Sequence, residues 1–304
     1  MSATGPVAAG SAPRPVAVVS GKGGVGKTHV VVSLAVAAAA RGARVLVVDG
    51  DLGLATVDVL LGLVPERSVA DVLSGESTIA GAVVEGPAGI HVLPAASGRS
   101  ELASLGGHRL TRLVAALWQA AREYDLVLLD AGAGIGPSVI GLSAACTRGL
   151  LITTPEPTSL ADAYATRKVL RHYAPALSLG LVVNKADGEL DAHRTHVHLD
   201  RLSQRFLQAP LPFAGFLPRD PKVLAATLRQ QPVPLAFPQA PFVRRLLPIA
   251  DALLHAGSAG SHDAVHADGA GSQDLSRAHG ARSHHLSRTA RAATSIPPIG
   301  GPSR

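Results

Sequence analysis

Cysteine is almost absent from this chain of 304 residues, since Cys146 is the only one. A single thiol excludes a disulfide framework, and it leaves no set of cysteines for an iron–sulfur cluster or a structural zinc site. Aromatic residues are also scarce, at 3% of the chain. We assign Trp118 and Tyr124 to packing and not to a platform that stacks nucleic-acid bases.

Concentrated charge is lacking as well. The formal net charge is +6, but only 16% of the residues are charged and no dense stripe of Lys and Arg is present. We therefore expect no dedicated DNA groove and no DNA partner. Residues 1–15 are rich in Ala, Gly, Pro and Ser and lack the basic patch and apolar core of a signal peptide or anchor. The sequence predicts a cytoplasmic protein.

Hydrophobic residues make up 47% of the chain, which is enough for one large α/β core. We predict a disordered N-terminal segment at 1–15, one domain at 16–255 and a disordered tail at 256–304, where Gly, Ser, Ala, His and Arg alternate without a period. The irregular spacing of the tail histidines favours a solvated linker over a metal site. These histidines are His262, His266, His279, His284 and His285.

A complete phosphate-loop motif, G-x-x-x-x-G-K-(S/T), follows a short apolar run and precedes a helical pattern. In such a loop, backbone N–H groups surround phosphate oxygens, the lysine reaches the β- and γ-phosphates and the hydroxyl binds magnesium. The helix that begins here adds its positive end to the site. The alternative is a plain glycine turn between strand and helix. The predicted nucleotide-binding residues here are Gly21, Lys22, Gly23, Gly24, Val25, Gly26, Lys27, Thr28 and His29.

Two apolar runs downstream end in carboxylates, at 44–49 and 125–130. In open α/β sheets, ligands bind beyond the carboxyl ends of the strands, so Asp49 and Asp51 are expected to point at the phosphates. Asp130 has the position of a Walker B carboxylate that holds magnesium. The predicted metal set is therefore Thr28, Asp51 and Asp130, with Ala131–Gly136 as a flexible loop beside the γ-phosphate. A turn or helix-cap role is the alternative for Asp51.

Together these features predict an α/β fold: a three-layer P-loop NTPase with a mostly parallel central sheet and helices on both faces. Ser68 and Gly75 are expected to start and end a short helix, and Ser159 with Asp162 is expected to form a capping box. The last helix of the domain is expected at 242–255. Pro248 is expected to interrupt that helix.

Asn184-Lys185-Ala186-Asp187 follows the predicted strand at 179–183. This tetrapeptide fits the N-K-x-D motif with which GTPases read guanine, so ATP and GTP both stay open. Residues 212–217 form one more predicted strand, after which Pro218 begins the next segment.

The loop sequence K-G-G-V-G-K-T, with Lys22 beside the first glycine, resembles the deviant Walker A loop of the MinD/ParA/Mrp ATPases. The resemblance implies ATP and Mg²⁺ as cofactors and an ATP-dependent homodimer in which Lys22 reaches the phosphates of the other subunit. It also implies that Asp51 orients the attacking water, which makes Asp51 and Lys22 the catalytic candidates. Asn184 would contact adenine and Pro218 would flank the base. Many relatives carry Asn where this chain has Thr56.

Across residues 16–254 the chain resembles the flagellar FlhG group, also called FleN or YlxH. The blocks that carry this match are 51–62, 130–135 and 153–159 with 162–164. The resemblance implies control of flagellar number or placement together with a signal-recognition-type GTPase. Two family features are missing: residues 1–15 contain no D-Q-A-x-x-L-R segment, and the tail has no amphipathic membrane-targeting helix. A peripheral contact with the membrane surface therefore has little support from the sequence.

Three functions stay open from the sequence. The first is a flagellar or cell-positioning ATPase switch. The second is a ParA-like partition ATPase that coats DNA, which would require a basic surface. The third is a scaffold that binds nucleotide without turnover.

Overall fold

The computed structural model describes residues 15–51, 56–95 and 107–258. The segments predicted to be disordered, 1–15 and 256–304, lie almost entirely outside these residues and stay predictions. The chain divides into a unit at Met1–Ala264 and a second at Val265–Arg304, and the described residues all belong to the first. No helix in the described ranges is both long and apolar enough to cross a membrane.

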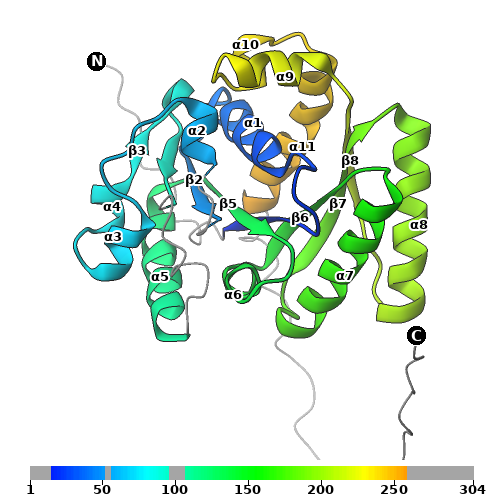
Figure 1. Ribbon diagram of the computed structural model, residues 1–304, viewed down its shortest axis with the longest axis horizontal. Helices are drawn as coiled ribbons and strands as arrows, with labels where there is room; N and C mark the ends of the chain where they lie inside the picture. The colour runs from blue at the N-terminus through cyan, green and yellow to red at the C-terminus, as the bar shows by residue number, and fades with distance from the viewer. Residues whose placement is uncertain (1–14, 52–55, 96–106, 259–304) are drawn as a thin grey trace, which may run out of the picture. The chain divides into compact units, whose positions relative to one another are not determined.

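An eight-stranded sheet forms the centre of this unit, in the order β3-β4-β2-β5-β1-β6-β7-β8 (Figure 1). Neighbouring strands are parallel except for β3 and β4, which are antiparallel. The strands are β1 (Val16–Ser20), β2 (Val45–Gly50), β3 (Val84–Glu85), β4 (His91–Leu93), β5 (Leu126–Ala133), β6 (Arg148–Thr153), β7 (Ser178–Ala186) and β8 (Phe213–Pro218).

Helices cover both faces of the sheet because its strands are apolar on both sides. In β1, Val16 and Val18 pack into one core with α1 and α11, whereas Ala17 and Val19 pack into the other with α5, α6, α7 and α8. This two-sided burial is typical of parallel sheets and confirms the three-layer prediction. The helices are α1 (Lys27–Ala39), α2 (Val57–Leu61), α3 (Val69–Ser74), α4 (Ile79–Ala82), α5 (Gly107–Ala120), α6 (Pro137–Ala144), α7 (Pro157–Tyr173), α8 (Glu189–Leu207), α9 (Pro221–Leu228), α10 (Val233–Ala236) and α11 (Pro241–Ser258), with short 3₁₀ turns at Pro87–Gly89 and Ala121–Glu123.

Local signals located the short helix α3 correctly. Ser68 is its N-cap and Gly75 its C-cap, and the Ser68 N–H donates to Asp71 Oδ2 at 2.8 Å to complete a capping box. The capping box predicted at Ser159 and Asp162 is wrong. Helix α7 begins two residues earlier, at Pro157, where proline fits the first helical position.

Two further predictions about elements are corrected. Strand β5 continues to Ala133, so half of the loop expected at 131–136 is strand, because Ala131 and Ala133 pair with β2 and β1. Helix α11 runs through Pro248 without interruption. Proline removes one helical hydrogen bond, but the buried contacts of Leu246 and Ile249 continue across it and hold the helix on the domain.

Candidate functional site

The phosphate loop connects β1 to α1 and has the backbone that its glycines permit. Gly24 and Gly26 have φ of 78° and 90°, a left-handed conformation that other residues rarely adopt. A Cβ atom on Gly21 would lie 2.2 Å from the Asp162 carbonyl, so α7 packs directly against the start of the loop. Close approach and left-handed turns thus explain three of the predicted glycines.

Lys27 and Asp130 form a buried ion pair beneath the loop. Lys27 Nζ lies against Asp130 Oδ1, and the side chains are only 8% and 0% exposed. Burial raises the pKa of Asp130, while the charge and hydrogen bond of Lys27, and the nearby Thr28 hydroxyl, oppose this shift. The structure therefore brings Lys27, Thr28 and Asp130 together in the C-terminal half of β5, and their roles toward phosphate and magnesium stay predictions.

The second carboxylate oxygen of Asp130 fits a magnesium site. Asp130 Oδ2 is buried and has no hydrogen-bond partner among the described residues, which is costly unless a cation or water satisfies it. No group of three His, Cys, Asp or Glu side chains in the described ranges could hold a metal. Magnesium suits such a place, because it binds through one or two protein oxygens while phosphates and water supply its other ligands.

Asp49 has a structural role that the sequence did not predict. Its carboxylate accepts hydrogen bonds from the backbone N–H groups of Asp51, Thr56 and Val57 at 3.0, 3.0 and 3.1 Å, and its orientation toward a phosphate stays a prediction. Its pKa is raised to about 7 by burial and by the charge of Asp130, against the effect of these bonds. Asp49 thus anchors both ends of the segment that follows β2.

Asp51 lies beside the magnesium candidates. It comes directly after β2, and its charge acts on Asp130 to raise the pKa of that residue. Thr28 Oγ1 lies 3.4 Å from Thr56 Oγ1. Thr56, where many relatives carry Asn, therefore lies beside the predicted magnesium residue Thr28. The three residues predicted to bind magnesium, Thr28, Asp51 and Asp130, are thus close together.

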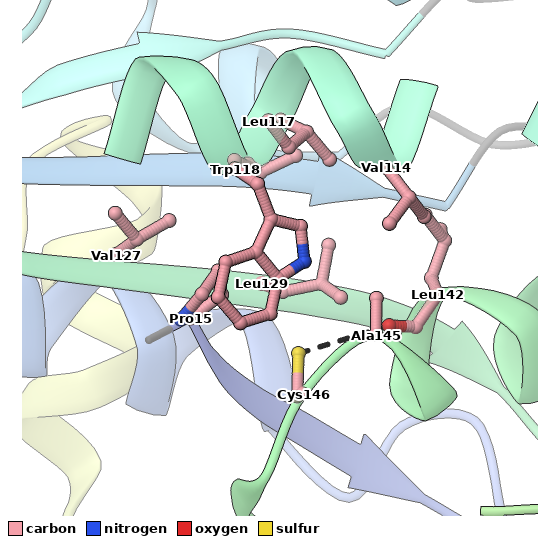
Figure 2. A pocket seen from close by; sticks show the side chains of 10 residues that line it. Pro15, Val114, Leu117, Trp118, Val127, Leu129, Leu142, Ala145 and Cys146 are labelled. Atoms are coloured by element: carbon pink, nitrogen blue, oxygen red, sulfur yellow. Dashed lines mark hydrogen bonds between the residues drawn. The ribbon is translucent and has the colours of Figure 1, made fainter. Parts of the chain in front are cut away.

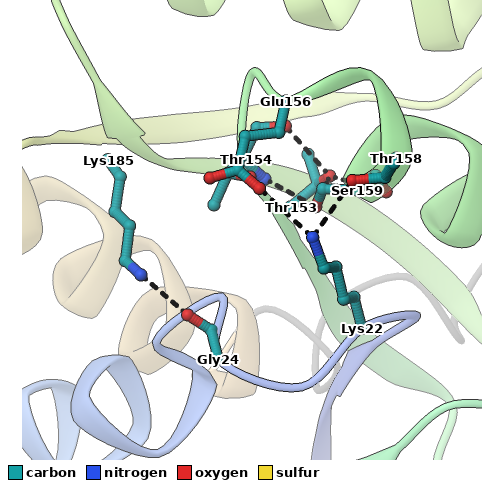
Figure 3. A network of polar contacts seen from close by, with 8 residues as sticks. All are labelled: Lys22, Gly24, Thr153, Thr154, Glu156, Thr158, Ser159 and Lys185. Atoms are coloured by element: carbon teal, nitrogen blue, oxygen red, sulfur yellow. Dashed lines mark hydrogen bonds and ion pairs between the residues drawn. The ribbon is translucent and has the colours of Figure 1, made fainter.

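Lys22 is held by the segment that follows β6. Its Nζ donates to Thr158 Oγ1 at 3.0 Å and lies 3.3 Å from Glu156 Oε2 (Figure 3). The pair is partly open to solvent, with side-chain exposures of 40% and 56%. Sequence reasoning assigned Lys22 to a partner subunit and missed these two contacts, although Glu156 and Thr158 fall within one of the motifs that it quoted.

Ser159 explains why the segment after β6 has a defined shape. Its Oγ accepts from the Thr154 N–H at 3.1 Å and lies 2.9 Å from Thr153 Oγ1, and all three residues are buried. Ser159 therefore fixes the turn that presents Glu156 and Thr158 to Lys22. It has this role in place of the predicted helix cap.

The end of β7 contacts the opposite side of the phosphate loop. Asn184 Nδ2 donates to Val25 O and Lys185 Nζ donates to Gly24 O, both at 2.7 Å. Figure 3 shows Lys185 extended toward Gly24. The Asn184 amide is buried under the loop, and its predicted contact with adenine stays a prediction.

Pro218 and His29 border this side of the loop as well. Pro218 ends β8 opposite Ala186 of β7. His29 Nε2 lies 3.4 Å from Thr227 Oγ1 of α9. Burial, and then the charge of Lys185, lowers the pKa of His29, which favours a neutral imidazole.

A small void of about 10 Å³ lies in the apolar core. Trp118, Leu142 and Cys146 are among the side chains around it (Figure 2). Burial raises the pKa of the Cys146 thiol to about 12. With no charged side chain in its lining and room for little more than one water, this void is a packing defect and not a ligand site.

Comparison with known proteins identifies the fold and its motifs. The model of the CobQ/CobB/MinD/ParA nucleotide-binding domain matches residues 16–233. The chain belongs to this family. The expected resemblance to ATPases of the MinD/ParA type is thereby confirmed.

An antiactivator and a flagellum site-determining protein are among the relatives of this MinD/ParA-type chain. The antiactivator FleN of Pseudomonas aeruginosa is 39% identical over 225 residues, which is 74% of this chain and 80% of FleN. The flagellum site-determining protein YlxH of Helicobacter pylori is 32% identical over 154 residues, or 51% of this chain and 52% of YlxH.

Two solved MinD structures have the same fold. The cell division ATPase MinD of Pyrococcus furiosus aligns with a TM-score of 0.69 at 26% identity, over 80% of this chain and 99% of that one. MinD of Pyrococcus horikoshii, solved with Mg-ADP, gives a TM-score of 0.68 at 25% identity, over 79% of this chain and 95% of the other.

Proposed function

We propose that this MinD/ParA-type protein binds MgATP at residues 21–29 and hydrolyses it slowly to ADP and phosphate. The observation that carries the proposal is the buried Lys27–Asp130 pair, in which Asp130 Oδ2 has no hydrogen-bond partner among the described residues and the Thr28 hydroxyl lies near the carboxyl group. A cation, a hydroxyl and a carboxylate in this arrangement match what a nucleotide polyphosphate and magnesium require. The Mg-ADP in the MinD of P. horikoshii supports the same ligand here.

Each of these side chains has a distinct task in the proposed reaction. Lys27 would exchange its contact with Asp130 for one with the β- and γ-phosphates, and Thr28 and Asp130 would hold magnesium. When bound, magnesium would neutralise charge that develops on the transferred phosphoryl group. Asp51 orients the attacking water and accepts its proton. Asp49 positions Asp51 through the backbone hydrogen bond at 3.0 Å.

The nucleotide also controls dimerisation in this proposal. Within one protomer Lys22 is bound by Glu156 and Thr158 of the segment that follows β6. Released from Glu156, it could extend to the γ-phosphate bound by a second copy and close that site. Since ADP lacks the γ-phosphate, ATP and ADP would differ in their affinity for the dimeric state, which is what a switch requires.

We further infer a role in flagellar number or placement, in the cytoplasm and with a signal-recognition-type GTPase as a candidate partner. The similarity to FleN and YlxH supports this role over chromosome partition. The contacts between Lys22 and the segment 153–159 favour a dimer switch over a passive scaffold, because a switch needs a residue that can exchange partners.

Light scattering and phosphate release test the biochemical core of the proposal. The full chain should elute at dimer mass with a non-hydrolysable ATP analogue and magnesium, and at monomer mass with MgADP. Phosphate should be released slowly from MgATP. Equal masses in both nucleotides would exclude the switch, and absence of phosphate release would favour a binding scaffold.

A further inference from the structure

The sheet order indicates where the base of a bound nucleotide lies. The carboxylates that belong with magnesium and the γ-phosphate lie on one side of β1, where Asp51 directly follows β2 and Asp130 lies in the C-terminal half of β5. On the other side of β1 lie β6, β7 and β8. Because the γ-phosphate end is directed toward the carboxylates, the nucleoside extends in the opposite direction, over the ends of β7 and β8.

The end of β7 is firmly bound to the phosphate loop. Asn184 and Lys185 donate to two successive loop carbonyls, those of Val25 and Gly24. Lys185 has φ of 56°, a left-handed conformation that lysine seldom adopts, and its ammonium contact helps to hold it there. The residues that follow are thereby placed at the border of the nucleoside site.

Asp187 is the chemically decisive residue of this turn. In an N-K-x-D motif a free carboxylate accepts hydrogen bonds from N1–H and N2–H of guanine. Adenine offers an unprotonated N1 at the same place, whose lone pair repels a carboxylate. An isolated Asp187 would therefore favour guanine.

Asp187 is not isolated, because Arg219 lies beside it. Arg219 Nε is 3.6 Å from Asp187 Oδ1, with side-chain exposures of 66% and 82%. The Arg219 backbone N–H donates to Ala186 O at 3.0 Å, which holds the arginine next to the motif. The Arg219 guanidinium neutralises the Asp187 carboxylate, and its N–H groups can donate a hydrogen bond to N1 of adenine.

We propose that Arg219 sets the base preference of the site by engaging Asp187, so that adenine is accepted and guanine is disfavoured. This inference rests on the proposed nucleotide-binding function. An exposed ion pair contributes little to stability in water. A bound base that covers the pair excludes solvent, which strengthens the attraction between Arg219 and Asp187 and raises the cost of binding a base whose hydrogen-bonding groups do not match.

Calorimetric titration of the full chain with MgADP and MgGDP tests the inference. Wild type should bind ADP more tightly than GDP. Arg219→Ala should shift the ratio of the two affinities toward GDP by about tenfold, the effect of one charged hydrogen bond on a base edge. The double variant Asp187→Ala/Arg219→Ala should lose this gain, since the carboxylate that reads guanine is gone.

Arg245→Ala is the matched control, because Arg245 forms a comparable exposed pair with Glu189 at 3.0 Å. The ratio of its affinities for ADP and GDP should equal that of wild type. If Arg219→Ala leaves the ratio at the value of this control, Arg219 does not select the base. A wild type that binds neither nucleotide would refute the proposed function, whereas tight binding with unchanged ratios would refute only the role of Arg219.

Discussion

Lys22 Nζ lies 3.3 Å from Glu156 Oε2 within one protomer, although 134 residues separate the two in the chain. The lysine that the family resemblance assigns to a neighbouring subunit thus has an intramolecular partner. Because the pair is about half exposed, its contribution to any equilibrium is modest, at about 0–1 kcal/mol. A contact of this strength can shift the equilibrium between monomer and dimer without preventing dimerisation.

Glu156→Gln should make ATP-dependent dimers form at lower protein concentration, because Lys22 would leave its protomer more easily. From the energy of an exposed pair we expect an increase of up to about fivefold in dimer affinity. Sedimentation velocity over a range of protein concentrations measures this. Glu189→Gln, which removes a carboxylate from the exposed Arg245 pair, is the control. Weaker dimerisation of Glu156→Gln would mean that Glu156 supports the dimer.

Lys22→Ala should bind ATP about as well as wild type but stay monomeric. The main cation for the bound phosphates is Lys27, which this variant retains, whereas the proposed contact across the dimer is lost. Binding of a fluorescent ATP analogue and light scattering provide the two measurements. Lys168→Ala removes an exposed lysine from α7 and should dimerise normally. Dimers of Lys22→Ala would contradict the proposed switch.

Asp51→Ala should retain ATP binding and lose phosphate release by about 100-fold, the lower range for a positioned acid–base group. Lys27, Thr28 and Asp130, which are proposed to hold the phosphates and magnesium, are all retained in this variant, so affinity should change little. The matched control is Asp125→Ala, since Asp125 pairs with Arg44 at the other end of β5. Unchanged phosphate release would exclude Asp51 as the catalytic residue.

Asp49 should make the folded state less stable as the pH rises. Its pKa is about 7 in the folded protein and 3.8 in its ordinary state, so between these values the folded state binds the proton more strongly. The free energy of unfolding then falls as pH increases through this window. Relative to Asp49→Asn, wild type should lose roughly 2–3 kcal/mol more between pH 5 and pH 8.

Urea denaturation at both pH values, for both proteins, measures this difference. Asp49→Asn will itself be less stable, since an amide oxygen replaces a carboxylate that accepts three N–H groups, but only the change with pH enters the comparison. Parallel pH profiles for the two proteins would show that Asp49 does not titrate in this window.

The sequence by itself determined those features that depend on neighbouring residues. The phosphate loop at 21–28, the carboxylates in the C-terminal parts of β2 and β5 and the caps of α3 all follow from short patterns, because glycine conformation, apolar runs and capping residues act over a few positions. Two-sided apolar strands such as β1 likewise predicted a sheet covered on both faces. These features were sufficient for the fold and for the location of the candidate site.

Only the tertiary structure decided which distant side chains meet. Asp49 was expected at a phosphate, and the return of the chain at Thr56 and Val57 gives its carboxylate backbone donors that the sequence did not predict. Ser159 contacts Thr153 where a helix cap was expected. Such contacts depend on strand order and on where each helix begins, and a short local sequence pattern does not determine either of these. The pairing of Lys22 with Glu156 and of Arg219 with Asp187 exists because β1 lies beside β6 and β7 beside β8.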